Sequence, residues 1–187
     1  PVGSRTVAVA STAGFSVGDR IAVERTPNTA WIDALGMAQW GWTESSYAIA
    51  HERRIVAIHG NNLTVDIPFV DAIQVAYGGG VGYRVDLSDR IQHTGVEDLR
   101  MVSEYQSDTD EAHGWNAVVF SRVVDSWVRR VTAVHFGYSA VTFSKESSFN
   151  TAEEVAQLDP ISQITGGRRY SFYVHDGVGN LFQRCFA

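Results

Sequence analysis

Four short stretches in the second half of the chain share one pattern of inward and outward positions, and this repetition constrains the fold more than any other feature. The stretches begin at Val96, Val128, Ala152 and Phe182. In each, the first, fourth and sixth positions are apolar and expected to face inward, except that Gln157 takes the sixth position of the third stretch. Such recurrence at unequal intervals indicates one supersecondary unit repeated with loops of different length.

A second set of strands recurs together with the first. Strands that alternate inward and outward residues begin at Val118, Val141 and Phe172, and a weaker copy begins at Val85. Two strand types that repeat in step are typical of coils stacked in parallel. The sequence therefore predicts an all-β fold, a right-handed parallel β-helix.

The first part of the chain predicts a small β-domain with a helical insertion. Alternating strands are expected at residues 6–9 and 21–24, with glycines supplying the turn between them. Residues 29–42 do not continue the strand pattern. Thr29 suits the N-cap of a helix, so we expect a helical segment to begin there. The three tryptophans of this insertion, Trp31, Trp40 and Trp42, form either an aromatic platform that binds a sugar ring or a plug packed on the sheet, and we favour the plug.

A hairpin and a glycine run complete this first domain. Strands at 54–58 and 63–67 flank a tight turn with residues suited to positive φ. The glycine-rich run 78–82 is interpreted as a hinge. We therefore expect a β-domain over residues 1–80 and the β-helix coils over 81–187.

Composition excludes several classes of protein. A formal net charge of -6 and a pI near 5.4 argue against a nucleic-acid partner, because phosphate binding favours a basic surface. Cys185 is the single cysteine, so the chain has no internal disulfide framework and no cysteine-based zinc cluster. No run of apolar residues is long enough to predict a membrane span.

Both ends of the sequence suggest a piece of a larger assembly. The chain begins without methionine, which is typical of a processed or excised product. Ala187 ends an inner strand without a polar cap, and such an edge presents unpaired backbone groups. We therefore expect a truncated sequence, a homo-oligomer, or continuation of the β-helix by another chain.

Stacking allows outward columns to be read across the coils, because equivalent residues of successive coils lie about 4.8 Å apart. The first set of stretches places charges of alternating sign in two adjacent columns: Asp98, Arg130, Glu154 and Arg184, and beside them Glu97, Arg129, Glu153 and Gln183. These charges are expected to pair along the stack. We interpret this face as structural. A glycosidase needs two carboxylates that face the same glycosidic bond, and here an arginine lies between the acidic residues.

The second set of strands gives a different pair of columns. They contain Asp89, Arg122, Lys145 and Asp176, next to Ser88, Ser121, Ser144 and His175. Lys145 is the only lysine of the chain, beside fourteen arginines. These columns have two alternative interpretations. They contain either a catalytic base with neighbouring cations or a further ladder of ion pairs.

Long loops lead into the second set of strands and are expected to stack as one wall. They span residues 103–116, 135–139 and 158–170, and loops of this kind often carry function. The polar and aromatic side chains that we expect in the wall are Asp108, Asp110, Glu111, His113, His135, Tyr138, Asp159, Arg168, Arg169 and Tyr170. Arg168 and Arg169 suit forked binding of a carboxylate or sulfate, and the alternative is a solvated turn in which they pair with Asp108 or Asp110.

One loop is also a candidate calcium site. Asp108, Asp110 and Glu111, with His113 close by, offer oxygen ligands that a hard cation prefers. The spacing does not match the twelve-residue calcium-binding loop, and the common hydrolase and zinc signatures are not present in the sequence.

The coil pattern Ser126-Trp127-Val128-Arg129-Arg130-Val131-Thr132 resembles that of the pectate-lyase-like superfamily of right-handed β-helices, and residues 7–9 and 14–19 are similar to entry domains of extracellular and phage-borne β-helix proteins. The resemblance implies that the strand before the short turn lines a substrate cleft. It would place Arg122, Lys145, His175 and Asp176 there.

Two functions follow from this reading. The first is an extracellular or cell-surface lyase that cleaves an acidic, uronic acid polymer by β-elimination. Its candidate catalytic residues are Lys145, His175, Arg122, His135 and Tyr138. Its candidate substrate-binding residues are Arg168, Arg169, Tyr170, Asp176, Trp40 and Trp42. The alternative is a non-catalytic β-helix that binds glycans or builds a surface fibre or spike.

Overall fold

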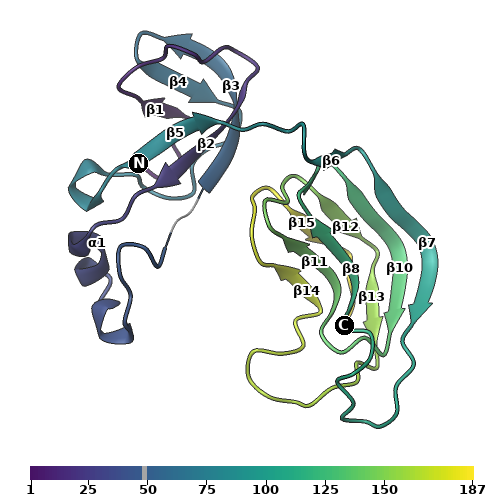
Figure 1. The fold of residues 1–187 in the computed structure, drawn as a ribbon. Helices are drawn as coiled ribbons and strands as arrows, with labels where there is room; N and C mark the ends of the chain where they lie inside the picture. Colours follow the sequence, from purple (N-terminus) through teal and green to yellow (C-terminus); the bar gives the residue numbers. More distant parts are fainter. Residues whose placement is uncertain (48–49) are drawn as a thin grey trace. The chain divides into compact units, whose positions relative to one another are not determined.

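The structure, a computed structural model, describes residues 1–47 and 50–187 and divides into two compact units, Pro1–Leu87 and Ser88–Ala187 (Figure 1). The division lies after Leu87, later than the expected boundary at residues 80 and 81. The reason is a strand, β5 (Gly80–Arg84), that pairs with β2 (Arg20–Arg25) and so belongs to the first unit.

The first unit is a five-stranded antiparallel sheet in the order β1-β4-β3-β2-β5. Its remaining strands are β1 (Thr6–Ala8), β3 (Ala50–His59) and β4 (Asn62–Val65). The expected hairpin is confirmed, since β3 and β4 pair around Gly60, which has φ of 57°. One face of the sheet is buried by the apolar residues Ile21, Val23, Ile55, Leu63, Val65 and Phe69.

The helical insertion consists of helix α1 (Thr29–Ala34) and the 3-10 turn η1 (Ala38–Trp40), and a second turn, η2 (Val75–Tyr77), precedes β5. The expected cap at Thr29 is wrong by one residue. The side chain of Asn28 accepts a hydrogen bond from the Trp31 N–H at 3.0 Å and caps the helix. Thr29 instead donates from its backbone N–H and its hydroxyl to Glu44.

The glycine run 78–82 is not a hinge, and that expectation is wrong. Gly78 adopts φ of 97°, and a Cβ at this position would lie 1.8 Å from the carbonyl oxygen of Thr26. Gly80 begins β5 and approaches the Glu24 backbone, where a Cβ would lie 2.5 Å from the carbonyl oxygen. These two glycines therefore permit close backbone packing within the first unit.

The second unit consists of stacked coils in which every strand pairs in parallel. Its strands are β6 (Ile91–Gln92), β7 (Gly95–Val102), β8 (Asn116–Ser121), β9 (Val123–Val124), β10 (Trp127–Val134), β11 (Ser139–Ser144), β12 (Thr151–Glu153), β13 (Ala156–Leu158), β14 (Phe172–Val174) and β15 (Leu181–Gln183). They form two larger parallel ladders, β7-β10-β12-β15 with β13 beside β10, and β8-β11-β14 (Figure 1). A third, short ladder joins β6 and β9. This arrangement confirms the expected parallel β-helix.

The register of the coils follows the repeated stretches. Val128 lies opposite Val96 on one side and Ala152 on the other, and Ala152 lies opposite Phe182. In the second set, Val141 lies between Val118 and Phe172 in the same way. The prediction of a fourth, weaker coil strand at residue 85 is wrong. The backbone N–H of Val85 bonds to the Arg20 carbonyl and so joins the first unit.

Each of the four stretches bends at its third position. The residues there, Asp98, Arg130, Glu154 and Arg184, have φ between 51° and 58°, in the left-handed region. The bend explains why two adjacent residues in each stretch both face outward. The first and fourth positions of the stretches still face the core, where Val128, Val131, Ala152 and Val155 are buried.

A buried asparagine joins three coils at another corner. Asn150 is fully buried; its side-chain oxygen accepts the Ser126 N–H at 3.1 Å and its amide donates to the Val123 carbonyl at 2.9 Å. The same amide donates to the Asn180 side chain of the next coil at 3.1 Å. These bonds satisfy backbone groups that the corner removes from the strand ladders.

Candidate functional site

The charged columns of the first set form the expected ladder of ion pairs. Arg129 contacts Glu97 at 2.6 Å, Arg130 contacts Asp98 at 2.5 Å, and Arg184 contacts both Glu153 and Glu154. The Arg130 hydrogen bonds hold the pKa of Asp98 below its usual value, and Asp98 in turn raises the pKa of Arg130. The arrangement supports a structural role for these charges.

The three long loops lie together at one edge of the β-helix. The His113 ring bridges two of them, with Nδ1 at 2.8 Å from Ser103 Oγ and Nε2 at 2.8 Å from the Ile161 carbonyl oxygen. Glu111 accepts the Gln163 N–H at 3.3 Å and pairs with Arg168. The loops therefore support one another and give the edge a defined surface.

This edge carries a cluster that we call the aromatic wall: Trp115, Tyr138, Arg168, Tyr170 and Tyr173. The Trp115 and Tyr138 rings stack with centroids 5.7 Å apart, and Tyr170 stacks on Tyr173 at 5.4 Å. Tyr138 joins the two pairs through edge contacts at 5.7 and 5.9 Å. The wall therefore crosses three successive coils, because its residues flank or belong to β8, β11 and β14.

The arginine of the wall is held in place from two sides. The Arg168 guanidinium carbon lies 5.0 Å from the Trp115 ring centroid, and the same side chain pairs with Glu111. Arg169 has a different role, since it donates to the Ser162 hydroxyl at 2.9 Å and to the Ser162 carbonyl. Among the described residues the arginines thus pair with neither Asp108 nor Asp110.

The phenol of Tyr138 is protonated at neutral pH. Burial, with smaller contributions from Tyr173 and Tyr170, raises the pKa of its phenol. A phenol with a raised pKa stays protonated and serves as a hydrogen-bond donor.

The structure brings the residues predicted to line a cleft only partly together. Arg122 pairs with Asp89 and lies 3.9 Å from Glu146, and the Asp176 carboxylate accepts backbone N–H groups of Glu146 and Gly177. Both side chains therefore stabilise the coil corner. Lys145 and His175 are exposed.

Two histidines make aromatic contacts at different places. The His175 ring lies 5.6 Å from that of Tyr173, at the end of the aromatic wall. The His135 ring instead packs edge-on against Tyr105 at 4.9 Å, in another part of the loop edge.

The three candidate metal ligands do not gather. Asp110 accepts backbone N–H groups of Gln106 and Ala112, which lower its pKa, and Glu111 is engaged by Arg168. Within residues 1–47 and 50–187, no three or more His, Cys, Asp or Glu side chains lie close enough together to hold a metal ion. Asp108 therefore belongs to no such group.

The tryptophans of the insertion divide into two environments. Trp42 stacks on Tyr47 at 5.1 Å and lies 6.4 Å from Trp31, over which the Arg25 guanidinium is placed at 4.8 Å. This packed group corresponds to the plug. Trp40 stands apart from it and is 72% exposed.

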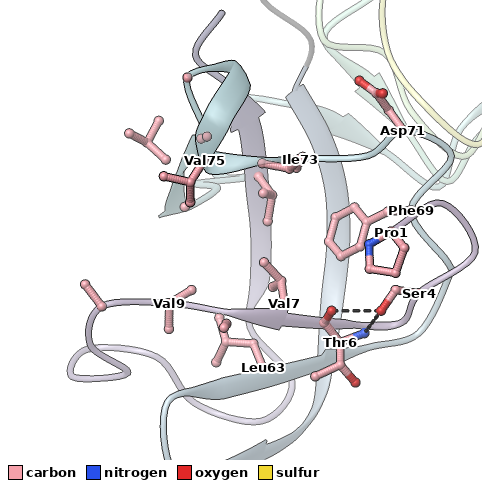
Figure 2. Close-up of a pocket in the computed structure, with 18 of the residues that line it drawn as sticks. Pro1, Ser4, Thr6, Val7, Val9, Leu63, Phe69, Asp71, Ile73 and Val75 are labelled. Carbon is pink, nitrogen blue, oxygen red and sulfur yellow. Dashed lines mark hydrogen bonds between the residues drawn. The ribbon is translucent and has the colours of Figure 1, made fainter.

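The first unit also contains an apolar cavity of about 730 Å³ that the sequence did not reveal (Figure 2). Its lining includes Val7, Leu63, Phe69 and Ile73, and Asp71 lies at one side. The Asp71 carboxylate accepts a hydrogen bond from Arg25 at 2.9 Å. The cavity therefore offers an apolar surface with its charged group already paired.

Sequence reasoning missed Trp115 and Tyr173 of the aromatic wall. Both are single aromatics without a motif around them. Tyr173 occupies an outward position of an alternating strand, and that position was the available signal.

The stacked parallel coils, the external ion-pair ladder and the loop edge define an all-β protein of the parallel β-helix class. Among solved structures, the tailspike protein gp49 from Pseudomonas phage LKA1 is similar, with a TM-score of 0.54 and 15% identity over 98% of this chain and 36% of that chain. This likeness shows a shared fold, without assigning the chain to the pectate-lyase-like superfamily in particular. The chain spans little more than a third of the length of gp49.

Two further tailspikes are more distantly similar. The gp54 tailspike of Acinetobacter baumannii bacteriophage AP22, solved in complex with A. baumannii capsular saccharide, has a TM-score of 0.43 and 10% identity over 97% of this chain and 36% of that one. The tailspike gp61 of Pseudomonas phage phi297 has a TM-score of 0.34 and 13% identity over 98% and 29%. No family model and no curated protein matches the sequence.

Within the described residues, no helix has the length and apolar character needed to cross a membrane.

Proposed function

We propose that this chain is the glycan-binding part of a surface spike or fibre protein, and that the aromatic wall binds an acidic polysaccharide outside the cell. The observation that carries the proposal is the placement of Arg168 over Trp115, beside three tyrosines on the loop edge of the β-helix. The likeness in fold to a phage tailspike is in keeping with this role.

The chemistry of the wall matches a charged sugar. Aromatic side chains combine a large apolar surface with a polar tip, which suits the C–H faces and hydroxyls of a pyranose. Tyr138 is a neutral hydrogen-bond donor at pH 7, and burial raises its pKa further. Arg168 supplies a planar guanidinium, which binds carboxylates by paired hydrogen bonds.

The wall is also prepared for binding before the ligand arrives. Stacking on Trp115 and pairing with Glu111 fix the orientation of Arg168, so binding orders few side chains further. Tyr170 is 46% exposed and is the most accessible ring of the wall in the described structure. We expect it to make the first contact with the sugar chain.

Binding to an acidic polysaccharide and to its carboxyl-reduced form tests the proposal. Surface plasmon resonance should show binding of the acidic form that Arg168→Gln and Tyr170→Ala each weaken by tenfold or more, on the order of 1.4 kcal/mol. Arg100→Gln is the matched control, because it removes the same charge from an exposed position of β7. Equal binding by all three variants, or equal binding of the reduced polymer, would refute the proposal.

A lyase activity on the same polymer is the second candidate function. Two exposed groups favour it: Lys145 follows β11, and His175 follows β14 on the adjacent coil. The backbone N–H of His175 bonds to the Phe143 carbonyl at 2.8 Å. A lysine and a histidine on neighbouring coils could supply a base and a cation for β-elimination. Ultraviolet absorbance of unsaturated sugar ends, measured with the native chain and with Lys145→Met, decides whether the glycan is cleaved as well as bound.

A further inference from the structure

A small hollow of about 350 Å³ lies on the outer face of the ion-pair ladder, away from the loop edge. It is lined by Trp127, Val128, Arg129, Thr151 and Glu153. The ladder by itself explains the charges of this face, but it gives no reason for an exposed tryptophan beside a cavity. The volume falls at the lower end of the range of small-molecule sites, roughly 300–1,000 Å³.

The position of the Trp127 ring creates the hollow. Trp127 lies opposite Gly95 on one neighbouring coil and opposite Thr151 on the other. Its ring leans over Gly95, where a Cβ would lie only 2.2 Å from the indole. The indole N–H also bonds to Glu97 at 3.1 Å on the same coil as Gly95. Space therefore remains above Thr151, beside the ring.

The ion pairs keep the polar walls of the hollow apart. Arg129 is drawn toward Glu97 on the preceding coil, at 2.6 Å. Glu153 pairs with Arg184 on the following coil, in the opposite direction along the stack. The two side chains lie on adjacent coils and lean away from each other, so the ladder holds the hollow open in advance of any ligand.

From this arrangement we propose that the hollow is a second saccharide subsite, which binds one neutral, hydroxyl-rich sugar ring. The indole supplies a surface for the C–H face of the ring, and Thr151, Glu153 and Arg129 supply a hydroxyl, an acceptor and a donor for its hydroxyls. The charges that line the hollow are one acid and one base, which favours a neutral ligand over a uronate. The subsite shares no residue with the aromatic wall, and the proposal stands even if the wall binds nothing.

The indole N–H signals of a ¹⁵N-labelled chain report on this site. The chain has five tryptophans, and Trp127→Phe assigns the signal of interest. Methyl glycosides of glucose, galactose, mannose and N-acetylglucosamine serve as probes. We expect at least one of them to shift the Trp127 signal in a saturable manner while the other indole signals stay in place.

Variants separate this site from nonspecific contact. Thr151→Ile fills the hollow with a residue that favours strands and should abolish the saturable shift, whereas Thr132→Ile, the same change elsewhere on the face of the helix, should leave it unchanged. Should Thr151→Ile fail to fold, Thr151→Val, which replaces the hydroxyl with a methyl group of similar size, should weaken the binding several-fold. Arg168→Gln in the aromatic wall should have no effect. The proposal is overturned if no glycoside gives a saturable shift, or if filling the hollow leaves the shift intact.

Discussion

Arg130 donates two hydrogen bonds to the Asp98 carboxylate on the preceding coil, at 2.5 and 2.6 Å. Both residues have left-handed backbones, with φ of 52° and 58°. The ion pair therefore forms at the corner where each coil bends. Substitutions can separate the contribution of the ion pair from that of the left-handed backbone.

Backbone strain at this corner predicts a contrast between two variants that both lack the ion pair. Glycine tolerates positive φ and valine does not. Arg130→Val should therefore lower the Tm of the second unit by roughly 4–8 °C relative to Arg130→Gly, the shift expected for the strain of one left-handed residue in a domain of this size. Thermal unfolding followed by circular dichroism measures the difference, and equal Tm values would contradict it.

The titration of Asp98 should depend on its partner. The Arg130 hydrogen bonds lower the pKa of Asp98 in the folded state, so the pair stabilises the fold above the unfolded pKa and ceases to do so as the pH falls through the folded pKa. Arg130→Gln should raise the pKa of Asp98 toward its ordinary value of 3.8. Carbon-13 NMR titration of the carboxyl group measures this pKa in the native chain and in the variant, and an unchanged value would contradict the prediction.

A buried histidine should make the first unit sensitive to acid. His51 is 2% exposed, and within the described residues neither ring nitrogen has a hydrogen-bond partner. Burial first, and then the charge of Arg53, lower the pKa of His51. The His51 imidazole therefore stays neutral in the folded state, whereas in the unfolded chain it takes up a proton below about pH 6.5. The free energy of unfolding therefore falls as the pH falls through that value.

Hydrogen exchange of the amides of β2 and β3 tests this dependence. Between about pH 7 and pH 5 the free energy of opening should decrease in the native chain, after correction for intrinsic exchange rates. In His51→Phe most of this decrease should disappear, because phenylalanine does not titrate. A decrease of the same size in both proteins would assign the effect to other groups.

Asn150 should contribute more to stability than any exposed pair of the ladder. Asn150→Ala leaves the buried Ser126 N–H and Val123 carbonyl without their side-chain partner. Loss of such buried partners costs about 1–3 kcal/mol of unfolding free energy. Denaturant unfolding of this variant gives the value, and Asn61→Ala, at the exposed hairpin turn of the first unit, is the control.

The sequence by itself determined the coil architecture, the register of the strands and the ladder of charges. Inward residues must recur at equivalent positions of every coil to build one continuous core, so Val96, Val128, Ala152 and Phe182 carry the register in their spacing. Outward charges then fall into columns without any further information, and Arg130 and Asp98 meet as expected.

Only the tertiary structure decided which loop residues meet, where each coil bends and where hollows remain. Loops follow no period, so the meeting of Arg168 with Trp115 depends on how three loops of unequal length pack. The copy expected at residue 85 failed for a related reason, because hydrogen bonding to Arg20 drew that segment into the antiparallel sheet of the first unit. The space beside Trp127 likewise depends on the direction in which the ring leans, and Gly95 on the neighbouring coil, more than thirty residues earlier in the chain, permits that direction.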